Sequence, residues 1–69
     1  MAVFTSAALT LRRKLIIEAL RKAGATNPES AKTLRETDLV NPDSFREYTE
    51  RLADMNVIVR SPGGKYYVK

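Results

Sequence analysis

The sequence predicts a small α+β fold, mostly α, in which three helices are followed by a C-terminal β-hairpin. The pattern Asn-Pro-acid-Ser occurs twice, at residues 27–30 and 41–44, and each copy has the features of a helix start. Asn caps free backbone N–H groups, Pro at the first helical position loses no hydrogen bond, and the acid suits the positive end of the helix dipole. Farther along, β-branched and aromatic residues flank residues 61–64 (Ser-Pro-Gly-Gly), which is typical of a hairpin turn.

The first helix is expected over about residues 6–23. Its apolar residues include the i, i+3 and i+4 spacings of a buried stripe. The cleanest face is made by Leu9, Ile16, Leu20 and Ala23. Gly24 then suits the left-handed conformation that ends a helix. The basic run at residues 12–14 is interpreted as a solvated helix face, because helix geometry spreads three successive side chains over a wide arc.

A second helix is expected over about residues 28–37, with Ala31 and Leu34 facing the core. Leu39 and Val40 are expected to pack at the corner that follows this helix.

A third helix is expected over about residues 42–55, because its apolar residues recur on one face. These residues are Phe45, Tyr48, Leu52 and Met55. Asn56 stands where a left-handed terminator belongs, and Asn tolerates that conformation better than most other residues.

The hairpin is expected over about residues 57–69. A two-residue type II turn of Pro62 and Gly63 would place Arg60 opposite Lys65. The face that packs on the helices would then hold Val57, Val59, Tyr66 and Val68, and the other face Ile58, Arg60, Lys65 and Tyr67. Opposed cations repel, so either a phosphate lies between them or both side chains extend into water.

Length and composition favour a single small domain over residues 1–69, with a core so small that a homodimer or a larger partner would help to stabilise it. The residues that could supply a dimer contact are the apolar segment 1–4 and the start of the first helix. The longest apolar run, residues 15–17, is too short to span a membrane, and the first residues lack the features of a signal peptide. We therefore expect a cytoplasmic protein.

Catalysis and metal chemistry find little support in the residues. The chain has no Cys and no His, which excludes disulfides, thiolate or His-ligated metals and a His general base. Ser and Thr have no partner for activation, and no Gly-rich phosphate loop precedes a helix. We expect no enzyme activity, no cofactor and no metal site.

The segment that begins with the second Asn-Pro-acid-Ser resembles the winged helix-turn-helix family. The matching residues are Asn41-Pro42-Asp43-Ser44-Phe45, Leu52, Asn56-Val57-Ile58-Val59-Arg60 and Tyr66-Tyr67-Val68. The resemblance is architectural and covers roughly residues 10–69. This chain departs from the family in having no obvious short strand between the first two helices, no Gly in the corner at residues 37–40, and a very short wing.

The resemblance implies double-stranded DNA binding by a small transcriptional regulator or a chromatin-associated factor, which would be nucleoid-associated. It places the exposed side of the third helix near bases and phosphates and the wing on phosphate. The implied DNA-binding residues are Ser44, Arg46, Glu47, Arg51, Arg60, Lys65 and Tyr67. Arg46 is the best candidate for guanine, because its fork can contact two acceptors.

Alternatives to these roles remain open. Arg46 could instead pair with Glu50, and Glu47 with Arg51, at the i, i+4 spacing of ion pairs on a helix. Tyr67 could be a half-buried strand residue.

The charge distribution favours a second function as well. Residues 41–56 hold two arginines and four acids, whereas residues 1–25 hold five cations and one acid, and residues 57–69 three cations and no acid. An acidic helix in the major groove meets phosphate repulsion, although an acid can accept a hydrogen bond from cytosine. The alternative is a winged helix that binds a protein through its third helix, as an adaptor or subunit of a nucleic-acid-processing complex. A ribosomal or RNA-associated protein is a third candidate.

Overall fold

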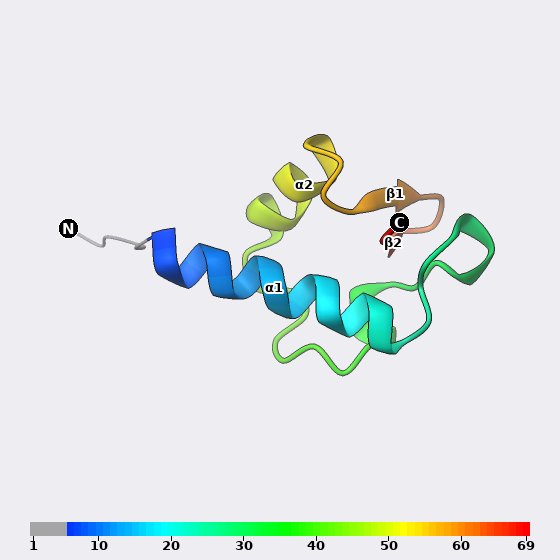
Figure 1. Ribbon diagram of the computed structural model, residues 1–69, viewed down its shortest axis with the longest axis horizontal. Coiled ribbons are helices and arrows are strands. Elements are labelled where there is room, and N and C mark those ends of the chain that lie inside the picture. Colours follow the sequence, from blue (N-terminus) through cyan, green and yellow to red (C-terminus); the bar gives the residue numbers. More distant parts are fainter. Residues whose placement is uncertain (1–5) are drawn as a thin grey trace.

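The computed structural model describes residues 6–69, and within them the chain forms a small α+β fold with two α-helices and a two-stranded antiparallel hairpin. The elements are α1 (Ser6–Lys22), the single 3₁₀ turns η1 (Pro28–Ser30) and η2 (Leu34–Glu36), α2 (Arg46–Asp54), β1 (Val59–Ser61) and β2 (Lys65–Tyr67). In Figure 1, α2 lies next to the middle of α1, and the hairpin lies nearer the C-terminal end of α1. The segment 1–4, expected as a dimer contact, lies outside the described residues.

The helix predicted over about residues 6–23 is confirmed as α1, and so is its termination at Gly24. Ile16 and Leu20 are fully buried. Gly24 adopts a left-handed φ of 80°, and the next amide, of Ala25, donates to the Leu20 carbonyl at 2.9 Å. The prediction of a solvated basic run is wrong for Arg12, which is only 8% exposed.

The prediction of a helix over residues 28–37 is wrong, because the chain makes two separate turns there. The Asn27 side chain caps η1 as predicted, accepting from the Ser30 amide at 2.9 Å. The backbone then becomes extended, and Lys32 exchanges two hydrogen bonds with Tyr66, at 3.0 and 2.7 Å. Pairing with β2 therefore replaces the hydrogen bonds that would have continued a helix. Ala31 and Leu34 are nevertheless buried, as expected.

The third predicted helix begins later than expected. Asn41 has a φ of 51°, which is left-handed and unlike the extended backbone of the capping residue Asn27. Residues 42–45 form a turn, and α2 begins at Arg46 after Phe45, which is also left-handed with a φ of 57° and a ψ of 40°. The two copies of Asn-Pro-acid-Ser thus adopt different structures. Asn56 ends the helical region with a φ of 60°, which confirms its predicted role.

The buried face of α2 is also displaced from the predicted stripe. Leu52 is fully buried, and Thr49 and Ala53 are buried beside it. The two ends of the predicted stripe face solvent, since Phe45 is 44% and Met55 57% exposed. At the preceding corner Leu39 is buried as expected. Val40 there is 73% exposed, so its predicted packing is wrong.

The hairpin has a three-residue turn of residues 62–64, so the predicted register is wrong by one residue. Ser61, not Arg60, is opposite Lys65, and Arg60 is opposite Tyr66. Consequently the two cations do not face each other. Ile58, expected on the outer face, is fully buried, whereas Val59 is half-buried.

A single cluster of buried apolar residues joins these elements. Its members are Ile16, Ala19, Leu20, Ala25, Leu34, Leu39, Leu52, Ala53, Ile58, Tyr66 and Val68. The Val68 amide donates to the Ala25 carbonyl at 2.9 Å, which ties the chain after β2 to the chain after α1. Within residues 6–69, no helix combines the length and the apolar character needed to cross a membrane.

Candidate functional site

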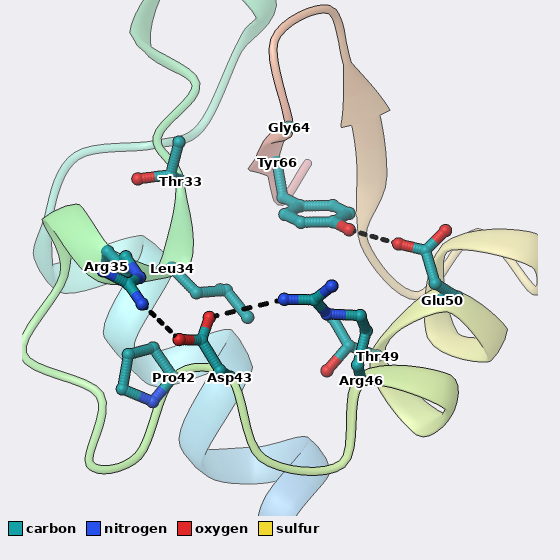
Figure 2. A pocket seen from close by; sticks show the side chains of 10 residues that line it. All are labelled: Thr33, Leu34, Arg35, Pro42, Asp43, Arg46, Thr49, Glu50, Gly64 and Tyr66. Carbon is teal, nitrogen blue, oxygen red and sulfur yellow. Dashed lines mark hydrogen bonds and ion pairs between the residues drawn. The ribbon is translucent and has the colours of Figure 1, made fainter.

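Two hollows in the surface flank α2, and Arg46 lines both of them. The hairpin-side pocket has a volume of about 290 Å³ and is shown in Figure 2. It is lined by Thr33, Leu34, Arg35, Pro42, Asp43, Arg46, Thr49, Glu50, Gly64 and Tyr66. The α1-side groove has a volume of about 490 Å³. It is lined by Leu9, Phe45, Arg46, Glu47, Tyr48 and Arg51.

Both arginines of the hairpin-side pocket are paired with the same acid, Asp43. Asp43 lies between two arginines in Figure 2, with Arg35 Nη2 at 2.6 Å and Arg46 Nη2 at 3.8 Å. The hydrogen bond from Arg35 lowers the pKa of Asp43. Because the lining holds two acids, Asp43 and Glu50, against Arg35 and Arg46, the pocket is a weak anion site.

Arg60, on strand β1 of the hairpin, is held in a second ion-pair network. Arg60 Nη2 lies 2.7 Å from Glu50 Oε1 and 3.3 Å from Asp54 Oδ1. The other carboxylate oxygen of Glu50 accepts a hydrogen bond from the Tyr66 hydroxyl at 2.5 Å. That hydrogen bond, together with Arg60, lowers the pKa of Glu50, whereas burial and the nearby Glu50 raise the pKa of Tyr66. The network fastens α2 to both strands of the hairpin.

We expect Glu50 to make folding stability depend on acid pH. Its pKa is lower in the folded chain than in the unfolded chain, so its contribution is fully present above the unfolded value, about 4.3. The contribution is lost as the pH falls through the folded value. Glu50→Gln should lower the thermal midpoint at neutral pH. Between about pH 6 and pH 3, the midpoint of this variant should decrease less than the midpoint of the wild type.

Glu47→Gln is the matched control for this change. Glu47 is exposed on the same helix and makes no ion pair within residues 6–69. Thermal scans followed by circular dichroism at several pH values measure both variants. Equal pH dependence in Glu50→Gln and the wild type would show that the ionisation of Glu50 adds nothing to stability.

The α1-side groove has an aromatic and apolar lining fixed by contacts with α1. The Tyr48 hydroxyl donates to the Leu9 carbonyl at 2.9 Å, so the first half of α1 is tied to α2 at the groove. The Phe45 ring lies over the Arg12 guanidinium, with 5.7 Å from the Arg12 Cζ atom to the ring centroid. Phe45 nevertheless remains 44% exposed.

Arg12 holds the turn from which Phe45 projects. Its Nη1 donates to the Val40 carbonyl at 2.9 Å, and its Nη2 donates to the carbonyls of Asn41 and Ser44 at 2.9 and 3.1 Å. Its Nε is buried and has no hydrogen-bond partner among residues 6–69. Burial lowers the pKa of Arg12. The guanidinium thus satisfies carbonyls of the turn that precedes α2.

The structure brings together only some of the predicted DNA-binding residues. Arg46, Glu47 and Arg51 are exposed and line the α1-side groove, and Ser44 is half-buried in the turn before α2. The other three predicted residues, Arg60, Lys65 and Tyr67, belong to the hairpin.

Their surroundings decide several of the open alternatives. The ion pair of Arg46 is with Asp43 and not Glu50, and no acid within residues 6–69 pairs with Arg51. Tyr67 packs against the core, which confirms the half-buried alternative for that residue. Lys65 is exposed.

Four residues of this site were not predicted from the sequence. Arg12 lies in a basic run, and Leu9, Phe45 and Tyr48 were assigned to buried stripes by their spacing. The geometry that unites them depends on the left-handed turn and has no pattern of its own in the sequence. Comparison with models of protein families, with curated proteins and with solved structures finds no match for this chain.

Proposed function

We propose that this chain is a binding module that docks a protein partner on the surface around α2. This proposal rests on one observation, that cations beside α2 are already paired with acids of the chain. Arg60 is paired with Glu50 and Asp54, and Asp43 is paired with Arg35, so three acids lie on the hairpin side of α2. Phosphate binding would have to displace these acids or accept their repulsion.

The apolar surface beside α2 supports the same proposal. Phe45 and Met55 are about half exposed at its two ends, and Phe45 lines a groove with Leu9 and Tyr48. Exposed aromatic residues next to arginines are characteristic of protein interfaces, whose central residues are depleted in Lys, Glu and Asp.

We further propose that the fold is a reduced winged helix. The order of helix, turn, helix and hairpin supports this proposal. So does the pairing of Lys32 with Tyr66, because it supplies one residue of a short strand between α1 and α2. A winged helix can bind either nucleic acid or protein, so the fold alone does not choose between them.

DNA binding is the second candidate function, and two exposed cations favour it. Arg51 on α2 and Lys65 on β2 have no ion pair within the part of the chain that the structure describes. Both are free to contact phosphate. In that case α2 would lie against the duplex, with Arg46 as the candidate for a base contact.

A titration with random-sequence duplex DNA, followed by backbone amide shifts at two salt concentrations, separates these functions. For a protein-docking module we expect no salt-sensitive shifts at Arg46, Arg51 and Lys65. Shifts at these three residues that appear at low salt and vanish at higher salt would overturn the proposal in favour of DNA.

A charge reversal sharpens the test. Glu47→Lys adds two positive units beside α2, whereas Glu29→Lys adds the same charge on the separate turn η1. For a protein-docking module both variants should change DNA affinity equally, through net charge alone. A DNA-binding α2 predicts a gain from Glu47→Lys that exceeds the gain from Glu29→Lys by about tenfold.

A further inference from the structure

We propose that the partner docks through an acidic amphipathic segment that binds in the α1-side groove. An apolar side chain of that segment sits between Leu9, Phe45 and Tyr48. Its carboxylates meet Arg46 and Arg51 at the rim. This inference rests on the proposed function and names the chemistry of the partner.

The first argument comes from the backbone at Phe45. A left-handed conformation is unfavourable for a residue with a Cβ and a bulky ring, and Gly or Asn would adopt it more readily. Here it is adopted by Phe45 at a φ of 57°, and the residue is 44% exposed. Within the chain the ring contacts the Arg12 guanidinium, and Phe45 still lines the groove. An aromatic side chain that is held in place and yet exposed is suited to anchor a partner.

The second argument is that the groove is preformed. Arg12 binds the carbonyls of Asn41 and Ser44 and lies under the Phe45 ring. Tyr48 is fixed by its hydrogen bond to the Leu9 carbonyl at 2.9 Å. A lining that is already ordered loses little conformational entropy when a ligand binds, so the groove can bind a short segment.

The third argument is charge complementarity. The groove lining holds Arg46 and Arg51 against the single acid Glu47. Arg51 has no ion pair within residues 6–69, and Arg46 is held only loosely, 3.8 Å from Asp43, with 76% of its side chain exposed. Guanidiniums prefer carboxylates, which they can bind through two parallel hydrogen bonds. A segment with acids beside an apolar anchor therefore fits this rim better than a basic one.

The test uses the whole chain and a pair of synthetic helical peptides. The first peptide carries Phe and Leu one helical turn apart with Glu at the flanking positions, and the second has Lys at every Glu position. We expect the acidic peptide to shift the amides of Leu9, Phe45 and Arg51 saturably. The basic peptide should bind at least about tenfold more weakly.

Variants of the chain locate the binding. Phe45→Gly removes the ring at a backbone conformation that Gly adopts freely, so the thermal midpoint should stay within about 5 °C of the wild type. Affinity for the acidic peptide should fall at least about tenfold. Arg51→Glu should remove the preference for the acidic peptide. Leu11→Ala is the control, because Leu11 is exposed on α1 but does not line the groove.

Several results would overturn the inference. Equal binding of both peptides would refute charge recognition, and no binding of either would refute the groove as a peptide site. Shifts at the groove residues on simple dilution of the chain would identify a second copy as the occupant. None of these results tests DNA binding. The proposal that α2 docks a protein is refuted only by the salt-sensitive amide shifts with DNA described above.

Discussion

Arg12→Ala should destabilise the folded chain by about 3 kcal/mol, a large effect for a single residue of α1. The substitution leaves carbonyls of Val40, Asn41 and Ser44 without their donor, and it removes the cation under the Phe45 ring. A chain of 69 residues has a small core, so this loss is a large fraction of its stability. Urea unfolding at neutral pH measures the change.

Arg13→Ala is the matched control, since it removes the same side chain from an exposed position next to Arg12. We expect it to change stability by less than about 0.5 kcal/mol. Arg12→Lys should lie between the two, because an ammonium keeps the charge but cannot span carbonyls as the guanidinium fork does. Similar losses from Arg12→Ala and Arg13→Ala would contradict the role given to Arg12.

Ile58→Ala should destabilise the chain by about 3 kcal/mol, because it opens a cavity in the core. Ile58 is fully buried in the segment that leads into β1, whereas its neighbour Val59 is half-buried. Val59→Ala should therefore cost less than about 1.5 kcal/mol. Thermal unfolding of both variants under one condition compares them. A larger loss from Val59→Ala would support the register with a two-residue turn, in which Val59 and not Ile58 faces the core.

The different burial of Ile58 and Val59 shows that the sequence does not determine the register of the hairpin. Val, Ile and Tyr on both sides of Pro-Gly-Gly predict two strands, and two strands are present. The register depends on whether the turn has two or three residues. In a run as uniformly apolar as residues 57–59, a shift by one residue is not penalised by any polar side chain.

The same limit applies to the helices. Capping signals identified helical turns correctly at Asn27, but they did not determine how long the helix would be. Thr33 and Glu36 form a second capping box in the structure, and the Thr-x-x-Glu spacing was a signal for a new turn within the predicted helix. Lys32 is extended because β2 pairs with it, a tertiary effect that local sequence does not reveal.

The candidate site was predictable only in its location. The exposed side of α2 was identified from spacing, and the acidic balance of residues 41–56 already favoured a protein partner as the alternative to DNA. The pairing of Arg60 depends on the hairpin lying against α2, so it could not be seen from i, i+4 spacing. The left-handed turn at Asn41 and Phe45 depends on Arg12, which is about 30 residues earlier in the chain.

The pairing of Lys32 with Tyr66 also constrains the order in which the chain can fold. Lys32, the extended residue between η1 and η2, gains its backbone hydrogen bonds only when β2 is in place. The Ala25 carbonyl likewise gains its hydrogen bond only when Val68 is in place. The backbone pairings of Lys32 and Ala25 join residues more than 30 positions apart in the chain. Closing so long a loop costs conformational entropy, so we expect it to slow folding relative to the formation of the helices. While that closure is pending, the edge of β2 is unpaired and open to β-strands of other chains.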